Sequence, residues 1–507
     1  MLKQLQAIVG VDHVSDEPGA CDLATSDIFE WPGRKPALMV AQPRTTDETS
    51  AILRVLREYG IAVIPRGAGL SYTGTFATKE AAVVVDTSRM NAIDVHVADR
   101  YTTVGAGASW SSVADALQPF GMKSAQASPI SGAYSTVGGL AAQGIPAGLD
   151  GILGLTVVLS DGSVVRTGAP TRFHRYAGPD LTGLFLGDCG ALGIKTEVVI
   201  RIAPEQPTAF ASFGFDDADN LLQSLIACVS EGIVTRAFAM DRVKSQDATK
   251  VELGEALSTS AAMIQQSGSL VQSAKDAAKL LRLAVAPKND KPWSLHLTAE
   301  SPTRPGAEAQ LQRAREICGS KGVEGDDVFP RALKAKPYSI RGFVGPSGER
   351  WVPVHGIFPL SNARSALTAL QGHTAAQSAQ MAELDVTASW LLSSSGPYVT
   401  LEPMLYWRDQ LDPIHMRYLS ARNRERFGAF AANPPARQLV RTMRESLRNI
   451  MDAHGAVHCQ LGRFYRPNNS SPDNPDALLM RLKAALDPNH RLNPGVLGTS
   501  ASAQIDV

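Results

Sequence analysis

The sequence predicts an α+β protein of more than one domain, and three observations support this prediction. The chain has 507 residues, which corresponds to about three domains at the usual domain size. Residues 36–205 alternate short strand and helix patterns and contain three glycine-rich segments. These segments end near residue 204, after which residues 216–285 have a helical pattern. We therefore expect one domain over residues 1–205, a second over 206–440 and a C-terminal segment over 441–507.

Composition and charge exclude several classes of protein. The chain is 44% apolar and carries 49 basic and 49 acidic residues, so it is globular and has a net charge of +0. A neutral surface argues against nucleic acid or a polybasic membrane contact as the main partner. No apolar stretch approaches the ~18 residues of a membrane span. The N-terminus lacks a signal-peptide pattern, and the five cysteines show no CxxC spacing. We expect a cytoplasmic protein that meets neither membrane nor nucleic acid.

The first elements predict a strand–helix–strand unit of α/β type. Thr45 and Glu48 have capping-box spacing and precede apolar residues at helical intervals over 52–59. A short strand at 61–64 runs directly into a glycine-rich loop at 65–74, and a second buried strand follows at 82–86. The loop therefore lies at the end of a strand, where side chains and backbone groups can line a site.

The next residues predict strands mixed with short helices. A strand with glycines spans 103–108, and Ser109 can cap a helix that carries Trp110, Val113 and Leu117 on one face. Asp-Gly at 161–162 predicts a hairpin between strands 155–159 and 164–166.

Beyond residue 205 the expected strands are 293–300, 351–358 and 397–406. Residues 286–292 and 323–350 are polar and predict loops. The last helix, 476–486, ends where Asp487-Pro488 stops it.

The loop after strand 61–64 has the composition of an anion-binding turn. Consecutive residues without bulky side chains can point their backbone N–H groups at phosphate oxygens, and glycine permits the positive φ angles that this needs. An ordinary tight turn is the alternative. The loop matches neither GxGxxG followed by a helix nor GxxxxGK[ST], so neither standard nucleotide-binding motif applies.

Four segments in chain order resemble the vanillyl-alcohol oxidase / p-cresol methylhydroxylase flavoprotein family. They are Pro-Arg-Gly-Ala-Gly-Leu-Ser at 65–71, Ser-Thr-Val-Gly-Gly at 135–139, the glycine-rich segment 186–197, and Leu-Asp-Pro-Asn-His-Arg-Leu-Asn-Pro-Gly at 486–495. The resemblance implies a PCMH-type FAD-binding domain of two subdomains and an α+β cap domain over the substrate. It also implies an FAD-linked oxidase C-terminal segment that returns to the FAD domain.

The resemblance implies which residues hold FAD. The pyrophosphate would lie on the first loop, formed by Arg66, Gly67, Ala68, Gly69, Leu70 and Ser71. Other positions that match the cofactor lining are Pro129, Ser131, Thr136, Gly138, Gly139 and Ile194, and Asn493 matches a position at the flavin edge. Some members tether FAD through a histidine in the first loop, where this chain has Ala68. We therefore expect non-covalent FAD, with a tether from the cap left open.

Two branches of the family predict different substrates. The 2-hydroxyacid branch has paired metal-binding histidines and a Glu-His-Gly segment. Here His355 has no such partner and Gln460-Leu461 stands in place of Glu-His, so we expect no metal. The phenol branch holds a phenolate with two tyrosines and an arginine, and Tyr72 and the pair Tyr465-Arg466 match those residues. Arginine stays charged and stabilises such an anion.

We therefore expect hydride transfer to flavin N5 from a para-substituted phenol or benzylic alcohol, as in aromatic compound catabolism. The alternatives are a D-2-hydroxyacid dehydrogenase and a flavin subunit that passes electrons to a partner protein. The expected partner is a small organic substrate; an electron-acceptor protein and a homodimer stay open. Further candidates, each with a plain structural role as its alternative, are Asp150 and His458 as bases, Arg463 for a substrate carboxylate, and Glu402, Tyr406 and Trp407 as pocket residues.

Overall fold

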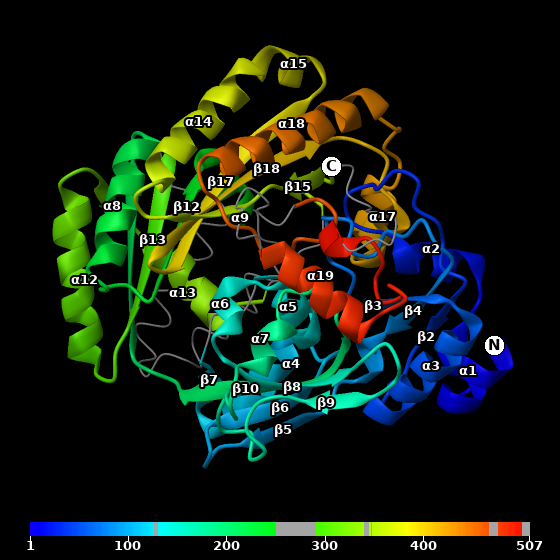
Figure 1. The fold of residues 1–507 in the computed structure, drawn as a ribbon. Helices are drawn as coiled ribbons and strands as arrows, with labels where there is room; N and C mark the ends of the chain where they lie inside the picture. The colour runs from blue at the N-terminus through cyan, green and yellow to red at the C-terminus, as the bar shows by residue number, and fades with distance from the viewer. Residues whose placement is uncertain (126–129, 250–290, 339–343, 346, 466–474, 499–507) are drawn as a thin grey trace. The chain divides into compact units, whose positions relative to one another are not determined.

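The structure, a computed structural model, describes residues 1–125, 130–249, 291–338, 344–345, 347–465 and 475–498. The chain forms two compact units (Figure 1). Unit 1 comprises residues 1–205 and 458–507, and unit 2 comprises residues 206–457. The boundary expected at 440/441 is wrong, because it falls inside the 20-residue helix α18 (Pro434–Ala453). Unit 1 is therefore discontinuous in sequence.

A four-stranded sheet with the order β1-β2-β4-β3 forms the first part of unit 1. Strands β2, β4 and β3 are parallel, as expected for a strand–helix–strand unit. Thr45 caps the connecting helix by accepting a hydrogen bond from the Glu48 amide (3.1 Å), and Gly60 ends it in a left-handed conformation. The elements are β1 (Val14–Ser15), β2 (Met39–Ala41), β3 (Ala62–Arg66), β4 (Ala82–Asp86), α1 (Leu2–Val9), α2 (Pro18–Thr25) and α3 (Thr46–Tyr59).

An antiparallel sheet with the order β5-β6-β10-β8-β9 forms the second part of unit 1, and β7 also pairs with β10. Strand β8 is buried along its whole length, and the expected hairpin joins it to β9. Ser109 caps α4, whose Trp110, Val113 and Leu117 are buried. The elements are β5 (Ile93–His96), β6 (Tyr101–Gly105), β7 (Met122–Ser124), β8 (Ile152–Val158), β9 (Val164–Arg166), β10 (Ile194–Pro204), α4 (Trp110–Leu117), α5 (Val137–Gln143), α6 (Pro146–Leu149) and α7 (Leu181–Leu184).

The C-terminal segment returns to unit 1 through helix α19 (Pro475–Leu486) and the residues after it. Lys483 is fully buried and its ammonium donates to the carboxylate of Asp487 and to the carbonyls of Ala191 and Leu492. A bridge between Leu492 and Val63 then attaches this segment to strand β3. Two chain segments far apart in sequence are thus fixed beside the end of β3.

Unit 2 is built on an eight-stranded sheet with the order β14-β11-β13-β12-β17-β18-β15, and β16 also pairs with β18. Figure 1 shows α8 and α12 along one side of this sheet. The strands are β11 (Thr208–Phe215), β12 (Arg236–Asp241), β13 (Trp293–Glu300), β14 (Val323–Gly325), β15 (Arg350–Pro353), β16 (Gly356–Pro359), β17 (Val386–Gly396) and β18 (Tyr398–Trp407). The helices besides α18 are α8 (Ala218–Ser230), α9 (Arg242–Thr249), α12 (Arg304–Gly319), α13 (Val328–Ala335), α14 (Ala363–Ala376), α15 (Ser378–Glu383), α16 (Pro413–Arg417) and α17 (Ala421–Phe427).

Several elements of unit 2 differ from the sequence prediction. The strand expected at 351–358 is two strands, β15 and β16, interrupted at 354–355. Residues 323–350, expected as a loop, contain β14 and α13. The α+β class itself is confirmed, since helices accompany one mixed sheet and two antiparallel sheets.

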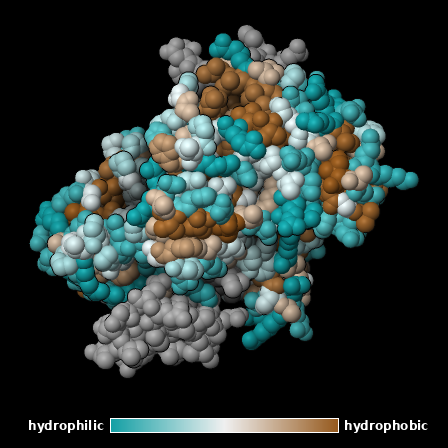
Figure 2. Space-filling model, turned by 90° about the horizontal axis from the view of Figure 1, so that it is seen from below, coloured by the Kyte–Doolittle hydropathy of each residue, from teal (hydrophilic) through white to brown (hydrophobic). Residues whose placement is uncertain are grey.

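The face shown in Figure 2 carries hydrophilic residues interspersed with several hydrophobic patches. Within the described residues, no helix combines the length and the apolar character needed to cross a membrane.

Candidate cofactor-binding site

A pocket opens in unit 1 beside the end of strand β3. Its walls come from β3 and the loop after it, from α5, and from the segment that leads into β10. The lining residues are Pro65, Arg66, Gly67, Thr75, Phe76, Thr87, Ala106, Gly138, Gly139, Ala142, Gln143, Cys189, Gly190, Gly193, Ile194 and Lys195. The three glycine-rich segments of the sequence therefore meet at one place.

Glycines allow these segments to approach one another closely. A Cβ atom at Gly67 would collide with the hydroxyl of Thr136, and one at Gly138 would lie 2.6 Å from the Cβ of Ala106. Gly190 has a φ of +75°, and a Cβ there would collide with the Pro65 ring. Side chains at these positions would push the walls apart, so the glycines define the shape of the pocket.

The loop after β3 presents backbone donors that the described residues leave unsatisfied. The amides of Gly67, Gly69, Leu70 and Ser71 donate no hydrogen bond to any described residue, although Gly69 and Ser71 are buried. Buried amides without acceptors are costly, and successive amides in such a turn form a concave anion site. Gly69, with a φ of +79°, supplies the left-handed residue of the turn. The loop therefore fits the pyrophosphate of FAD.

Arg66 holds this loop in place. Its side chain is buried, and Nη1 donates to the carbonyls of Ala24 (2.7 Å) and Ser26 (3.0 Å). The guanidinium also lies over the Phe76 ring, 4.6 Å from its centroid. Arg66 thus lines the pocket while anchoring it to the segment after α2.

Asn493 places a second unsatisfied group beside the pocket. It is fully buried; its backbone amide donates to the Val63 carbonyl (2.8 Å) and its Nδ2 donates to the Cys189 carbonyl (2.7 Å). Its side-chain oxygen, Oδ1, is buried and has no hydrogen-bond partner among the described residues. Because Cys189 lines the pocket, this oxygen suits a donor on a ligand bound there.

A buried ion pair gives the pocket wall a fixed charge arrangement. Lys195 donates to the carboxylate of Asp188 and to the Gly193 carbonyl (3.3 Å). Asp188 also accepts from the amides of Gly190 (2.9 Å) and Leu192 (3.1 Å). The carboxylate therefore orients the turn that carries the pocket glycines, and the lysine places an ammonium group at the wall.

Part of this pocket was expected from the sequence. Arg66, Gly67, Gly138, Gly139 and Ile194 line it, and Ala68, Gly69, Leu70 and Ser71 form the adjoining loop. Thr136 caps α5 by accepting from the Gly139 amide (3.1 Å), and the Ser131 hydroxyl bonds to Ser135 (3.3 Å). Pro129 and Arg466 lie outside the described residues.

Several lining residues were not expected from the sequence, among them Thr87, Gln143, Cys189, Gly190 and Lys195. Three of them lie in the glycine-rich segment 186–197, whose composition was a usable signal.

The segments that carry Tyr72 and Tyr465 are hydrogen-bonded to each other. The carbonyl of Thr73 accepts from the amides of Arg463 (2.8 Å) and Phe464 (3.1 Å). Tyr465 is 2% exposed and stacks on His458, with ring centroids 4.2 Å apart. Tyr72 therefore precedes Thr73 in the chain, and Tyr465 follows Phe464, which is hydrogen-bonded to Thr73.

Arg463 has a different role from the one expected. Its Nη1 donates to the carbonyls of Gly74 (2.5 Å) and Thr75 (3.1 Å), and its Nη2 donates to the Pro494 carbonyl (2.5 Å). Burial lowers the pKa of its guanidinium to about 10, so it stays charged at neutral pH. Because backbone carbonyls occupy these donors, Arg463 positions the glycine loop and the C-terminal segment and is not the carboxylate ligand that we expected.

We predict that Arg463→Met weakens FAD binding at least tenfold, because three carbonyls lose donors at roughly 0.5–1.5 kcal/mol each. Titration of the apoprotein with FAD measures this. Arg491→Met is the matched control, since Arg491 donates to a single exposed carbonyl, that of Arg57. An unchanged FAD affinity combined with a raised KM for substrate would return Arg463 to a substrate-binding role.

Asp150 is not positioned as a base in this pocket. It is exposed, follows the short helix α6 and is absent from the pocket lining. An exposed carboxylate keeps its water shell and holds no fixed geometry toward a bound ligand. Asp150 is therefore better interpreted as part of a structural turn with Gly151 than as a base.

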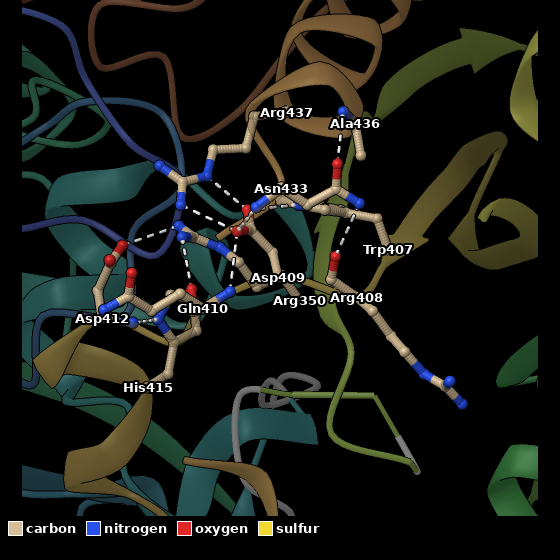
Figure 3. A network of polar contacts seen from close by, with 10 residues as sticks. All are labelled: Arg350, Trp407, Arg408, Asp409, Gln410, Asp412, His415, Asn433, Ala436 and Arg437. Carbon is tan, nitrogen blue, oxygen red and sulfur yellow. Dashed lines mark hydrogen bonds and ion pairs between the residues drawn. The ribbon is translucent and has the colours of Figure 1, made fainter. Parts of the chain in front are cut away.

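Trp407 belongs to a structural network in unit 2 and not to a substrate pocket. It is 1% exposed, and its indole Nε1 donates to Asp409 (3.0 Å). Asp409 also binds Arg437 through both carboxylate oxygens (2.5 and 2.9 Å) and accepts from the Asn433 amide (2.7 Å). Figure 3 shows these side chains converging, with Arg350 nearby. The network joins the end of β18 to α18.

Glu402 and Tyr406 lie on the other face of β18, because strand residues alternate sides and both numbers are even. Trp407 therefore does not share a strand face with Glu402 and Tyr406, although we expected all three as pocket residues. No cluster of three or more His, Cys, Asp or Glu suited to a metal occurs in the described parts of the chain.

Residues 37–168 match the family model of an FAD binding domain, and residues 469–497 match that of the C-terminal domain of FAD linked oxidases. The mitochondrial D-lactate dehydrogenase [cytochrome] of Arabidopsis thaliana is 30% identical over 41% of this chain and 38% of its own length. The glycolate oxidase subunit GlcD of Bacillus subtilis is 30% identical over 41% of this chain and 45% of its own length. The matched region thus spans less than half of either relative.

The fold is shared with enzymes of known structure. A crystal structure of p-cresol methylhydroxylase with substrate bound superimposes with a TM-score of 0.69, covering 98% of this chain and 96% of that one, at 16% identity. At this identity the likeness concerns the fold alone.

Proposed function

We propose that this chain, which carries the FAD-binding domain and the C-terminal domain of FAD-linked oxidases, is an FAD-dependent oxidoreductase that acts on a D-2-hydroxy acid. FAD binding is supported by the loop amides that donate no hydrogen bond to a described residue and that lie beside a pocket lined by glycines. The substrate part is supported by relatives named as D-lactate dehydrogenases and a glycolate oxidase subunit. When bound, FAD supplies the acceptor for hydride.

The residues of unit 1 would hold FAD in a defined way. The amides of Gly67, Gly69, Leu70 and Ser71 would bind the pyrophosphate, whose charge suits this concave turn. The Oδ1 of Asn493 would accept a hydrogen bond from the cofactor and so satisfy its buried oxygen.

FAD is held without a covalent bond in this proposal. Cys189 is a thiol among the pocket-lining residues, and Ala68 stands where some family members have a tethering histidine. Burial raises the pKa of the Cys189 thiol to about 12, so it is protonated at neutral pH and a poor nucleophile. Its Sγ also accepts from the Gly462 amide (3.3 Å).

A para-substituted phenol is the second candidate substrate. It is favoured by the hydrogen bond between Thr73 and Phe464, which brings the segments of Tyr72 and Tyr465 together as a phenolate site would need. The sequence relatives favour the hydroxy acid, so we rank the phenol second. A partner protein that accepts electrons is part of either proposal, and one relative is named for a cytochrome.

Two measurements on the purified protein test this proposal. We expect about one FAD per chain, released into the supernatant by acid precipitation. With an artificial dye as electron acceptor, D-lactate or glycolate should support turnover and 4-ethylphenol should not. A colourless protein that takes up no FAD would contradict the flavin proposal, and turnover with 4-ethylphenol alone would select the phenol.

A further inference from the structure

Two lysines of unit 1 are buried in ion pairs, and they differ in how many of their donors the protein uses. Lys483 donates to the carboxylate of Asp487 and to the carbonyls of Ala191 (2.7 Å) and Leu492 (2.8 Å). An ammonium group has three N–H donors, so each donor of Lys483 has an acceptor within the protein. The hydrogen bonding of this lysine is therefore complete without a ligand.

Lys195 is buried in a similar pair but has one donor left over. Its side chain is 3% exposed, and its Nζ donates to the carboxylate of Asp188 and to the Gly193 carbonyl (3.3 Å). Among the residues that the structure describes, no third acceptor contacts this ammonium group. A buried donor without an acceptor costs stability, so the remaining N–H suits an acceptor on a bound ligand.

Asp188 fixes the position of this ammonium group. Its carboxylate is itself held by the glycine-rich turn, because it accepts from the amides of Gly190 (2.9 Å) and Leu192 (3.1 Å). The Asp188 side chain is 1% exposed, so water does not compete with these bonds. The Lys195 Nζ therefore stays at the pocket wall with a defined orientation, which is the condition for recognising one group of a ligand.

Lys195 lines the same pocket as Gly67, the first residue of the loop whose amides would bind the pyrophosphate of FAD. Arg66 and Lys195 are the cationic side chains among the described lining residues. Both phosphates of the pyrophosphate are negatively charged, and a buried anion needs hydrogen bonds and a compensating charge. The ammonium group of Lys195 supplies both, through the donor that Asp188 and Gly193 do not use.

We propose that Lys195 donates its remaining N–H to a pyrophosphate oxygen of FAD, and that Asp188 positions Lys195 for this contact. The inference rests on the proposed function and adds a charged side chain to the backbone amides of residues 67–71. A hydrogen bond between an ammonium group and an anionic oxygen is roughly twice as strong as one between neutral groups. Lys195 therefore contributes to the affinity for the cofactor, and its effect depends on the phosphates of the ligand.

ADP and adenosine separate a phosphate contact from a general effect on the pocket. ADP carries the pyrophosphate and adenosine lacks it, so the ratio of their dissociation constants in one variant reports the phosphate contact. Each compound competes with FAD for the FAD-free protein, and flavin fluorescence follows the competition. In Lys195→Met we expect ADP to bind at least tenfold more weakly and adenosine to bind as in the wild type. Lys3→Met is the control, because Lys3 is an exposed lysine of unit 1.

Two further variants separate binding by Lys195 from the structural role of the ion pair. In Asp188→Asn the lysine keeps its charge and loses its counter-ion, so the preference for ADP over adenosine should be retained or increase. The double variant Lys195→Met with Asp188→Asn leaves no unpaired charge in the pocket wall. It therefore serves where Lys195→Met alone does not fold, and it should show the same loss of preference for ADP.

The outcomes distinguish this inference from the proposed function. If the wild type binds FAD but the ratio for ADP and adenosine is the same in Lys195→Met, Lys195 does not bind the pyrophosphate and the proposed function stands. If Lys195→Met and Asp188→Asn weaken ADP and adenosine by one common factor, the pair only shapes the wall and the inference is wrong. If the wild type binds no FAD, the proposed function fails and this inference fails with it.

Discussion

Gly69→Val is expected to lower the affinity for FAD about a thousandfold. Gly69 has a φ of +79°, which valine rarely adopts, and a Cβ there would collide with the guanidinium of Arg66. The loop must then move, and its amides no longer meet the pyrophosphate. Two lost charge-assisted hydrogen bonds at about 2 kcal/mol each correspond to this factor. Fluorescence titration of the apoprotein with FAD measures the change.

Gly121→Val is the control variant. It shows whether backbone strain at a glycine of positive φ is enough to lower the affinity for FAD, or whether the glycine must lie in the binding loop. Gly121 also has a positive φ, +61°, but no atom lies within 4 Å of a Cβ built there. It belongs to unit 1 and is not among the pocket residues. We expect normal FAD affinity in this variant. Retained tight binding in Gly69→Val would mean that the loop is an ordinary turn.

Asp409→Ala should lower the free energy of unfolding of unit 2 by about 3 kcal/mol. Asp409 is fully buried, and its removal leaves Arg437, the Trp407 indole and the Asn433 amide without their acceptor. Chemical unfolding followed by tryptophan fluorescence measures the loss. The control is Asp216→Ala, because Asp216 forms an exposed pair with Lys291, worth at most about 1 kcal/mol.

The Asp409 network also predicts how the free energy of unfolding changes at acidic pH. Burial alone would raise the pKa of Asp409, but hydrogen bonds from Arg437, Asn433 and Trp407 hold it below its ordinary value. Its contribution is therefore complete above the unfolded-state pKa, about 4, and is lost as the pH falls through the lower folded-state value. The stability difference between wild type and Asp409→Ala should shrink in that acidic range. A difference independent of pH would contradict the ionised network.

Local signals predicted much of unit 1. The Thr45 cap, the Ser109 cap and the Asp161-Gly162 hairpin each depend on residues a few positions apart, and the structure contains all three. Strand β11 was not predicted, and β12 lies within residues 216–285, which we expected to be helical, because the burial of both strands comes from neighbours distant in sequence. Helix α13 is only eight residues long, and its polar flanks resemble a loop.

The candidate site was predictable where glycine carried the signal. The composition of the loop at 66–71 is compatible with an anion-binding turn and equally with an ordinary tight turn, and only the family resemblance distinguished the two. Arg463 could not be assigned, since sequence does not tell whether a guanidinium meets a ligand or backbone carbonyls. The error at Trp407 was avoidable, since strand alternation separates it from Tyr406.

The central claim is that bound FAD accepts hydride from a 2-hydroxy acid, and anaerobic stopped-flow reduction tests it most directly. The purified yellow protein is mixed with D-lactate, glycolate or 4-ethylphenol, and the visible absorbance of oxidised flavin is followed over time. We predict full bleaching by at least one of the two hydroxy acids, at a rate that saturates with concentration, and none by 4-ethylphenol. Bleaching by 4-ethylphenol with neither hydroxy acid active would contradict the account.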